Sequence, residues 1–149
     1  MLRNTAREIA IHLSYELNFA TRDIPEMLDN RLSEESFAAL AEECNLYEVL
    51  PGAKQMEYIR GLVTGVAMHQ GELDGYIEKY AVGWKFSRIP MMAVAIMRIA
   101  MYEVMYRQDI PTGVAINEAV EIAKTYGQSA SGGFVNAVLA KIAKLDKQA

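Results

Sequence analysis

Two arginines near the start of the chain, Arg3 and Arg7, are spaced so that they could bind phosphate groups together. In an α-helix, side chains four residues apart lie on the same side, one turn above the other. His12 is expected to join that side about one turn later. Guanidinium groups form charge-assisted hydrogen bonds with phosphate oxygens. The spacing therefore predicts a small basic corner that contacts a phosphate-bearing ligand, and the alternative interpretation is a solvated helix end.

Two aromatic residues, Tyr126 and Phe134, lie on either side of a stretch of small residues, "QSASGG". Aromatic rings beside such a break can present their faces to unpaired bases, and each stacked base contributes roughly 1–3 kcal/mol to binding. The alternative is that both rings pack the junction between two helices. The pattern is thus a second candidate for contact with a nucleic acid.

No constellation of residues indicates catalysis. The two histidines, His12 and His69, are far apart in sequence, and the one cysteine, Cys44, excludes an internal disulfide or a cysteine metal cluster. The sequence has no nucleophile elbow, Walker loop or dinucleotide fingerprint. A short acidic stretch is interpreted as solvated surface, with carboxylates at Glu72, Asp74 and Glu78. We expect no enzymatic activity, no metal and no cofactor.

Composition and charge limit the classes of partner. The chain has 149 residues, of which 52% are hydrophobic and 23% charged, values typical of a folded globular protein. No apolar run is long enough to span a membrane and no signal peptide is apparent, so a cytoplasmic location without membrane attachment is expected. The formal net charge is -4, so binding to a nucleic acid needs a local basic patch or a basic partner.

Helical periodicity recurs in the first half of the chain. The first helix is predicted to begin at Thr5, because Thr5 and Glu8 have the spacing of a capping box, and to end near Thr21. A second helix is predicted around "DIPEMLDNRL", with Pro25 in its first turn. Ser33 is the expected cap of a continuation, which leaves open whether the segment is one bent helix or two.

The rest of the chain also reads as helices, and strand signals are nearly absent. The stretch "MMAVAIMRIAMYEVMY" is apolar on nearly all sides, which indicates a central helix packed against several others. Ser129 or Ser131 is expected to begin the last helix. The sequence predicts an all-α fold of about seven helices in two packed bundles, a single domain over 1–149 with subdomains of about 1–80 and 81–149.

Several motifs, read in order, identify a resemblance to a known family. From Trp84 to Ile142 the chain carries "WKFSRIP", "IMRIAMYEVMY", "DIP", "VAINEAVEIAKTYG" and "FVNAVLAKI", and near its start it carries "AREIAIHLSYEL". Together these closely resemble the bacterial transcription antitermination factor family NusB. The resemblance covers essentially the whole chain and is weaker between Asp23 and Asp74.

The resemblance implies a function without catalysis. Proteins of this family bind the boxA sequence of nascent RNA together with NusE, a small-subunit ribosomal protein, and help RNA polymerase read through terminators in ribosomal RNA operons. The positions that match RNA-contacting residues of the family are Arg3, Arg7 and Phe134, with Tyr126 a candidate beside Phe134. Tyr15 matches a tyrosine of the family's first helix and is expected to contact NusE.

Three departures from the family pattern bear on these expectations. The chain has only two basic residues in "MLRNTAR", where members often carry three or more, so RNA affinity without NusE is expected to be lower. Ala93 and Val94 replace a common acidic and basic pair, which removes or relocates a NusE contact. Ala137 replaces the glycine of "FVNG", a change that favours helix continuity.

Two other functions fit a chain of this type. One is a protein-binding adaptor that retains the fold without binding RNA, which the thin basic corner would suit. The other is the RNA-binding domain of a ribosomal RNA cytosine methyltransferase, which requires a methyl-donor domain in addition. The sequence is compatible with a monomer or a homodimer when the protein is alone.

Overall fold

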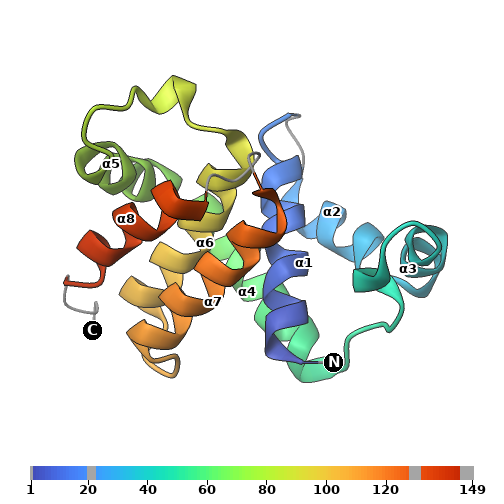
Figure 1. Cartoon of the computed structure of the whole chain (residues 1–149). Coiled ribbons are helices and arrows are strands. Elements are labelled where there is room, and N and C mark those ends of the chain that lie inside the picture. Colours follow the sequence, from blue (N-terminus) through green and yellow to red (C-terminus); the bar gives the residue numbers. More distant parts are fainter. Residues whose placement is uncertain (1, 20–22, 128–131, 145–149) are drawn as a thin grey trace. The chain divides into compact units, whose positions relative to one another are not determined.

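The computed structural model describes residues 2–19, 23–127 and 132–144, and these residues form eight α-helices and two short 3-10 helices with no strand among them. The predicted all-α class is confirmed. In chain order the elements are α1 (Arg3–Glu16), α2 (Ile24–Arg31), α3 (Glu34–Ala41), η1 (Asn45–Tyr47), α4 (Ala53–Met68), α5 (Gln70–Tyr80), η2 (Phe86–Arg88), α6 (Met91–Tyr106), α7 (Thr112–Thr125) and α8 (Gly132–Ile142) (Figure 1).

Helix α1 begins earlier and ends earlier than predicted. Its N-cap is Leu2, whose carbonyl accepts from the Ala6 amide at 3.1 Å, so Thr5 is already inside the first turn and caps nothing. At the other end the Asn18 side-chain amide donates to the Tyr15 carbonyl at 3.0 Å. This bond satisfies a terminal carbonyl and closes the helix at Glu16, five residues before the expected end.

The segment between Asp23 and Ala41 forms two helices. Pro25 occupies the first turn of α2, as predicted. Asp23 is the N-cap of this helix, and its Oδ1 accepts from the Glu26 amide at 2.9 Å. Ser33 adopts an extended backbone, and its hydroxyl oxygen accepts from the Ser36 amide at 3.2 Å to start α3. This additional break explains why the structure has one helix more than the seven expected.

The chain divides into two compact units, Met1–Thr64 and Gly65–Ala149, so the division falls within α4 and not near residue 80. The reason is that α5 packs against α6 and α8 and therefore belongs to the second unit. In the first unit α1 contacts η1, α2 contacts α3, and α3 contacts η1. Its buried apolar side chains include Ile9, Leu13, Leu28, Phe37 and Ile59.

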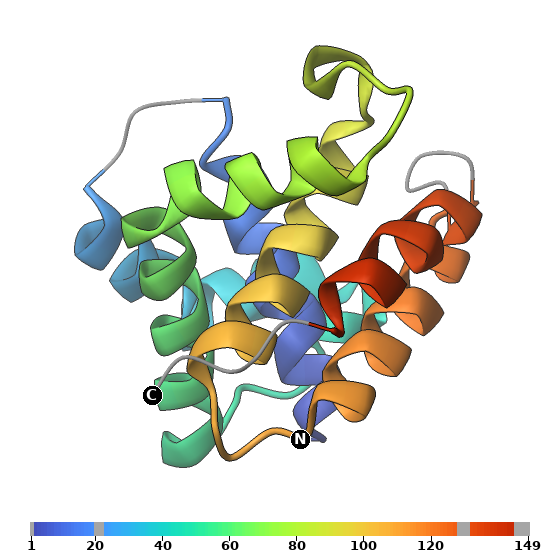
Figure 2. The same ribbon diagram turned by 90° about the vertical axis from the view of Figure 1, so that its left-hand side faces the viewer.

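Helix α6 is the centre of the second unit. It contacts α5, α7 and α8, and all side chains from Ala93 to Met101 are buried, as the uniformly apolar sequence predicted. Helices α7 and α8 run side by side, and α8 also packs against α5 (Figure 2). The starts proposed for the last helix, Ser129 and Ser131, lie outside the described residues, and the described part of α8 begins at Gly132.

Candidate nucleic-acid interface

Arg3 and Arg7 meet over one aromatic ring of α4. The Arg3 guanidinium carbon lies 5.7 Å from the centre of the Tyr58 ring, and that of Arg7 lies 6.0 Å from it. A cation over the face of an aromatic ring is attracted by the ring's negative face. The i, i+4 spacing therefore places the two arginines together, as predicted. Both guanidinium groups contact the ring of Tyr58.

The two arginines differ in exposure. Arg3 is exposed, whereas Arg7 retains only 1% of its accessible surface, and its Nη1 donates to Asn4 Oδ1 at 2.6 Å. A buried guanidinium engaged with side chains of its own unit is poorly placed to neutralise a phosphate in solvent. Of the two arginines, only Arg3 is therefore accessible to a ligand from solvent, and Arg7 is better suited to holding Tyr58 and Asn4 in place.

His12 does not join the side of the arginines. Five residues after Arg7, it lies about 140° further round a helix that turns about 100° per residue. Its Nδ1 is 3.2 Å from the Tyr47 hydroxyl, and the two rings are tilted at a centre distance of 6.2 Å. Burial lowers the pKa of His12, while the carboxylates of Glu8 and Glu16 act in the opposite direction.

The lowered pKa of His12 predicts a pH dependence of stability. Because the unfolded chain binds the proton more readily than the folded chain, the free energy of unfolding falls as the pH falls through about 6.5, the ordinary pKa of histidine. Replacing His12 by glutamine is expected to flatten this dependence between about pH 7.5 and 6. Urea unfolding of both proteins across that range measures it, and parallel curves would contradict the assignment to His12.

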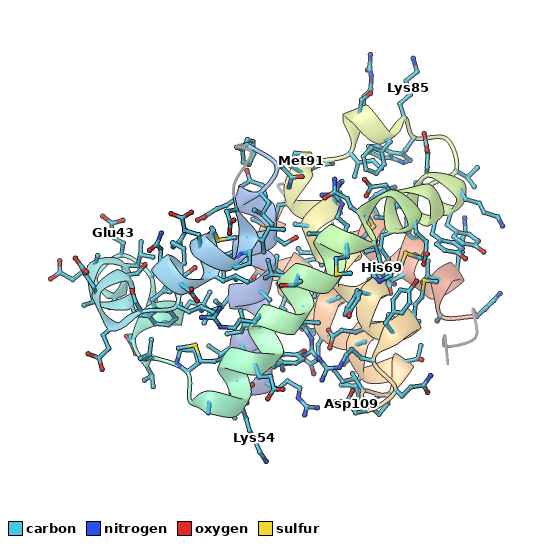
Figure 3. The ribbon with its side chains drawn as sticks, turned by 180° about the vertical axis from the view of Figure 1, so that it is seen from behind. Glu43, Lys54, His69, Lys85, Met91 and Asp109 are labelled. Carbon is cyan, nitrogen blue, oxygen red and sulfur yellow. The ribbon has the colours of Figure 1, made fainter. Side chains whose placement is uncertain are left out.

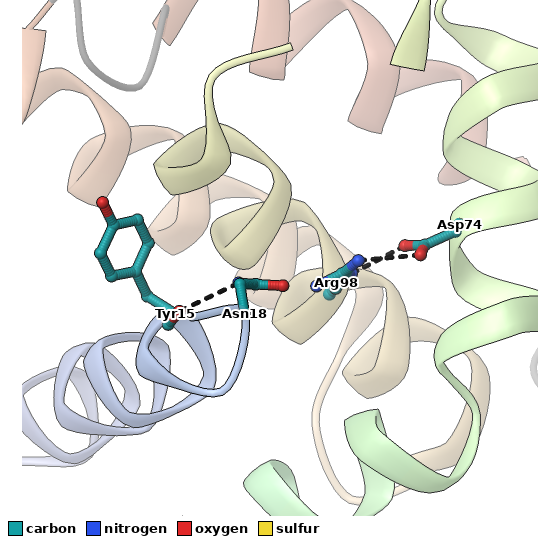
Figure 4. Close-up of polar contacts among 4 residues, drawn as sticks. All are labelled: Tyr15, Asn18, Asp74 and Arg98. Atoms are coloured by element: carbon teal, nitrogen blue, oxygen red, sulfur yellow. Dashed lines mark hydrogen bonds and ion pairs between the residues drawn. The ribbon is translucent and has the colours of Figure 1, made fainter. Parts of the chain in front are cut away.

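Tyr15 belongs to an aromatic pair at the end of α1. It is half-buried, and its ring packs edge-on against Phe19 at a centre distance of 4.9 Å. Phe19 is 64% exposed, so the pair offers an apolar surface of the kind that binds protein partners. Figure 4 shows the Tyr15 carbonyl held by Asn18. The sequence analysis identified Tyr15 but not Phe19, which lies four residues later at the end of "YELNF".

Phe134 lies in the first turn of α8, half-buried against Trp84. The two ring centres are 4.7 Å apart and the ring planes are tilted by 47°. Tyr126 is the half-buried C-cap of α7, and its amide donates to the carbonyls of Ala123 and Lys124. The ring that the structure brings to Phe134 is thus Trp84, which sequence reasoning used only as part of a family motif.

The arginines and Phe134 belong to different units, which are described separately. Their placement on one common surface therefore stays a prediction. The family positions Ala93 and Val94 are fully buried in α6, so these side chains provide no surface for a partner. Ala137 is exposed within α8, which continues through it without interruption, as expected for a substitution that favours the helix.

Two carboxylates interpreted as solvated have defined partners. Asp74 binds Arg98 through two bonds, from Nε at 2.7 Å and from Nη2 at 2.8 Å (Figure 4). Glu72 accepts from the Tyr106 hydroxyl at 2.5 Å, and this hydrogen bond raises the pKa of Tyr106 to about 12. The interpretation as solvated surface is wrong for Asp74, which pairs with the buried Arg98 on α6. Glu72 is exposed as expected, although its carboxylate also binds the Tyr106 hydroxyl.

The described residues include no group of three or more His, Cys, Asp and Glu side chains placed to hold a metal ion. None of the described helices is both long and apolar enough to cross a bilayer. What the described residues provide instead are two clusters, the arginines over the Tyr58 ring and the aromatic pair of Trp84 and Phe134. The fold and these clusters define the class of the protein. It is a helical protein of two compact units, and its surface side chains are of the kinds that bind other molecules.

Comparison with known proteins identifies the family. The sequence pattern of the NusB family matches residues 4–144. The transcription antitermination protein NusB of Acetivibrio thermocellus is 43% identical over 145 residues, which are 97% of this chain and 90% of that protein. The chain therefore belongs to the NusB family.

Solved structures agree with this assignment. NusB of T. maritima aligns with a TM-score of 0.80 at 28% sequence identity, over 98% of this chain and 93% of that chain. A chain in the crystal structure of a plectonemic RNA supercoil aligns with a TM-score of 0.73 at 26% identity, over 95% of this chain and 94% of that chain. The helical fold of this chain is thus shared with a solved NusB structure.

Proposed function

We propose that the protein is a transcription antitermination factor that binds boxA-type single-stranded RNA together with NusE. The observation that carries the proposal is its similarity, along almost the whole chain, to a protein named for transcription antitermination. The similar chain in a crystal structure of an RNA supercoil supports RNA as the ligand. In this function the protein acts in the cytoplasm within an RNA polymerase antitermination complex, promotes read-through in ribosomal RNA operons, and catalyses no reaction.

The proposed contacts follow from exposure and chemistry. Arg3 is exposed beside Tyr58 and serves as a phosphate ligand. Phe134 stacks on an unpaired base, together with Tyr126 at the end of the preceding helix. The pair of Tyr15 and Phe19 contacts NusE, because an edge-on aromatic pair with one exposed ring is a typical anchor for a protein partner.

The charge of the chain explains why a partner is needed. With a net charge of -4 and one exposed arginine in the N-terminal corner, the protein alone neutralises few phosphates. Each neutralised phosphate releases counterions and adds to affinity at low salt. A basic ribosomal protein supplies further phosphate contacts, so the pair is expected to bind RNA more tightly than either protein alone.

Fluorescence anisotropy of a labelled boxA oligonucleotide tests the proposal directly. We expect weak, salt-sensitive binding by the protein alone and a gain in affinity of at least tenfold when NusE is present. A scrambled oligonucleotide of equal length is the control, and it should gain less. If boxA and scrambled RNA bind equally even with NusE, the protein is instead an adaptor, a function that the burial of Arg7 would suit.

The different exposure of the two arginines predicts different effects of their loss. Arg3→Gln is expected to reduce the slope of log affinity against log salt by about 0.7, the value for one phosphate contact on a single strand, without changing stability. Arg7→Gln is expected to leave the slope unchanged and to lower the free energy of unfolding by about 1–3 kcal/mol, because a buried side chain loses its hydrogen bond to Asn4 and its contact with the Tyr58 ring. Salt titrations and urea unfolding of both variants measure this, and a reduced slope in Arg7→Gln would make Arg7 a direct ligand.

A further inference from the structure

Trp84 is the exposed member of the ring pair that it forms with Phe134. It retains 46% of its accessible surface, whereas Phe134 is half-buried. The 4.7 Å contact uses one side of each ring and leaves the remaining surface of Trp84 open to solvent. An exposed indole that is braced by a second ring has a defined orientation and can accept a base by stacking.

The two segments that carry this ring pair contain several cations and no acid. Residues 79–91 and 132–144 contain five of the 15 Lys and Arg of the chain and none of its 19 Asp and Glu. Lys85, the N-cap of η2, and Arg88, its last residue, are exposed, and no ion pair links either to another described residue. Lys85 points away from the helices into solvent (Figure 3). In a chain of net charge -4, this is a local positive surface.

The fold of the second unit brings the two segments together. Helix α5 packs against α8, and Lys141 Nζ on α8 donates to the Tyr80 carbonyl at the end of α5 at 3.4 Å. The segment after α5 then carries Trp84 to the first turn of α8, where it meets Phe134. Trp84, Lys85, Arg88, Phe134 and Lys141 are called the Trp84 face below.

We propose that the Trp84 face is a binding site for unpaired RNA, in which Trp84 stacks on a base while Lys85 and Arg88 contact the flanking phosphates. The inference rests on the proposed function, because it extends the RNA path from Phe134 along the second unit. Alternating rings and cations on one surface match the alternation of bases and phosphates in a single strand. A protein partner would use the exposed indole equally well, but three exposed cations without an acid favour a polyanion.

The single tryptophan of the chain makes the site directly observable. Stacking of a base on an indole quenches its fluorescence, so the emission of Trp84 reports binding at this face in the unaltered protein. We expect titration with boxA RNA, in the presence of NusE, to quench the emission of Trp84 with the same midpoint as the anisotropy of the labelled RNA. Free N-acetyltryptophanamide at equal RNA concentration corrects for light absorption, and NusE alone gives the baseline.

Substitutions separate stacking from charge. Trp84→Ala is expected to weaken RNA binding about tenfold and Trp84→Phe less than threefold, because a smaller ring still stacks. Lys85→Gln and Arg88→Gln are each expected to reduce the salt slope by about 0.7. Arg107→Gln is the control: it removes one positive charge, paired with Asp109, at the other end of α6, a helix of 16 residues and about 24 Å, and should leave the slope unchanged. Circular dichroism verifies that each variant is folded.

The outcomes distinguish this site from the proposed function. If anisotropy shows boxA binding while the emission of Trp84 is unchanged and Trp84→Ala binds normally, the site is absent and the proposed function stands. If anisotropy shows no boxA binding even with NusE, the proposed function fails and the site fails with it. If NusE alone changes the emission, and Trp84→Ala weakens binding of NusE but not of RNA, the face is a protein interface and the inference is overturned.

Discussion

Replacing Asp74 by alanine is expected to lower the free energy of unfolding by about 3 kcal/mol, since it leaves a buried guanidinium without its counter-ion. The Arg98 side chain is 4% exposed and that of Asp74 23%, and two hydrogen bonds of 2.7 and 2.8 Å join them. The pair links α5 to α6, and these helices hold the two ends of the segment that carries Trp84 and η2. Its loss should therefore disturb the Trp84 face as well as the core.

Two further variants make this expectation specific. Glu78→Ala removes an exposed carboxylate one turn later on α5 and is expected to change stability by less than about 0.5 kcal/mol. Adding Arg98→Met to Asp74→Ala removes the buried charge and should recover most of the lost stability. Urea unfolding measures all three. A cost for Asp74→Ala no larger than that for Glu78→Ala would mean that groups other than the Asp74 carboxylate satisfy Arg98.

Local patterns in the sequence were sufficient for most of the fold. The apolar periodicity identified the helices, and the predicted cap at Ser33 was correct because a capping bond joins residues three apart and is visible in the sequence. The cap at Asp23 has the same spacing to Glu26 but was not predicted. The capping box at Thr5 has the same signature but was wrong, because the first turn already closes on Leu2. A local motif shows where a helix can begin, but it does not show which of two possible starts is used.

The candidate site was predictable only where neighbours on one helix define it. The spacing of Arg3 and Arg7 placed them together, but the burial of Arg7 depends on Tyr58, 51 positions further along the chain. The ring that meets Phe134 lies 50 positions before it, and the partner of Asp74 lies on the next helix. The absence of acids around Trp84 was the one signal in the sequence that could have drawn attention to that segment.

Two glycines one turn apart in α4 are expected to respond in opposite directions to alanine. An alanine Cβ at Gly65 would overlap the ring of Tyr102, whereas one at Gly61 would meet nothing within 4 Å. Alanine favours a helix over glycine by about 1 kcal/mol, so Gly61→Ala should stabilise the protein by up to that amount. At Gly65 the same gain is outweighed by overpacking, which costs about 1–3 kcal/mol. The two variants should therefore differ by about 2 kcal/mol in the free energy of unfolding.

The cost at Gly65 depends on whether the Tyr102 ring can move aside. That ring lies 5.3 Å from the ring of Tyr106 and 6.1 Å from that of His69, which itself stacks on Tyr106 at 4.4 Å. Movement of Tyr102 breaks this three-ring cluster, so relief of the overlap has its own cost. In a Tyr102→Ala background the overlap is gone, and Gly65→Ala should then stabilise the helix as Gly61→Ala does. Thermal and urea unfolding of the four variants measure the coupling, and a Gly65→Ala protein as stable as Gly61→Ala would mean that Tyr102 leaves its place at no cost.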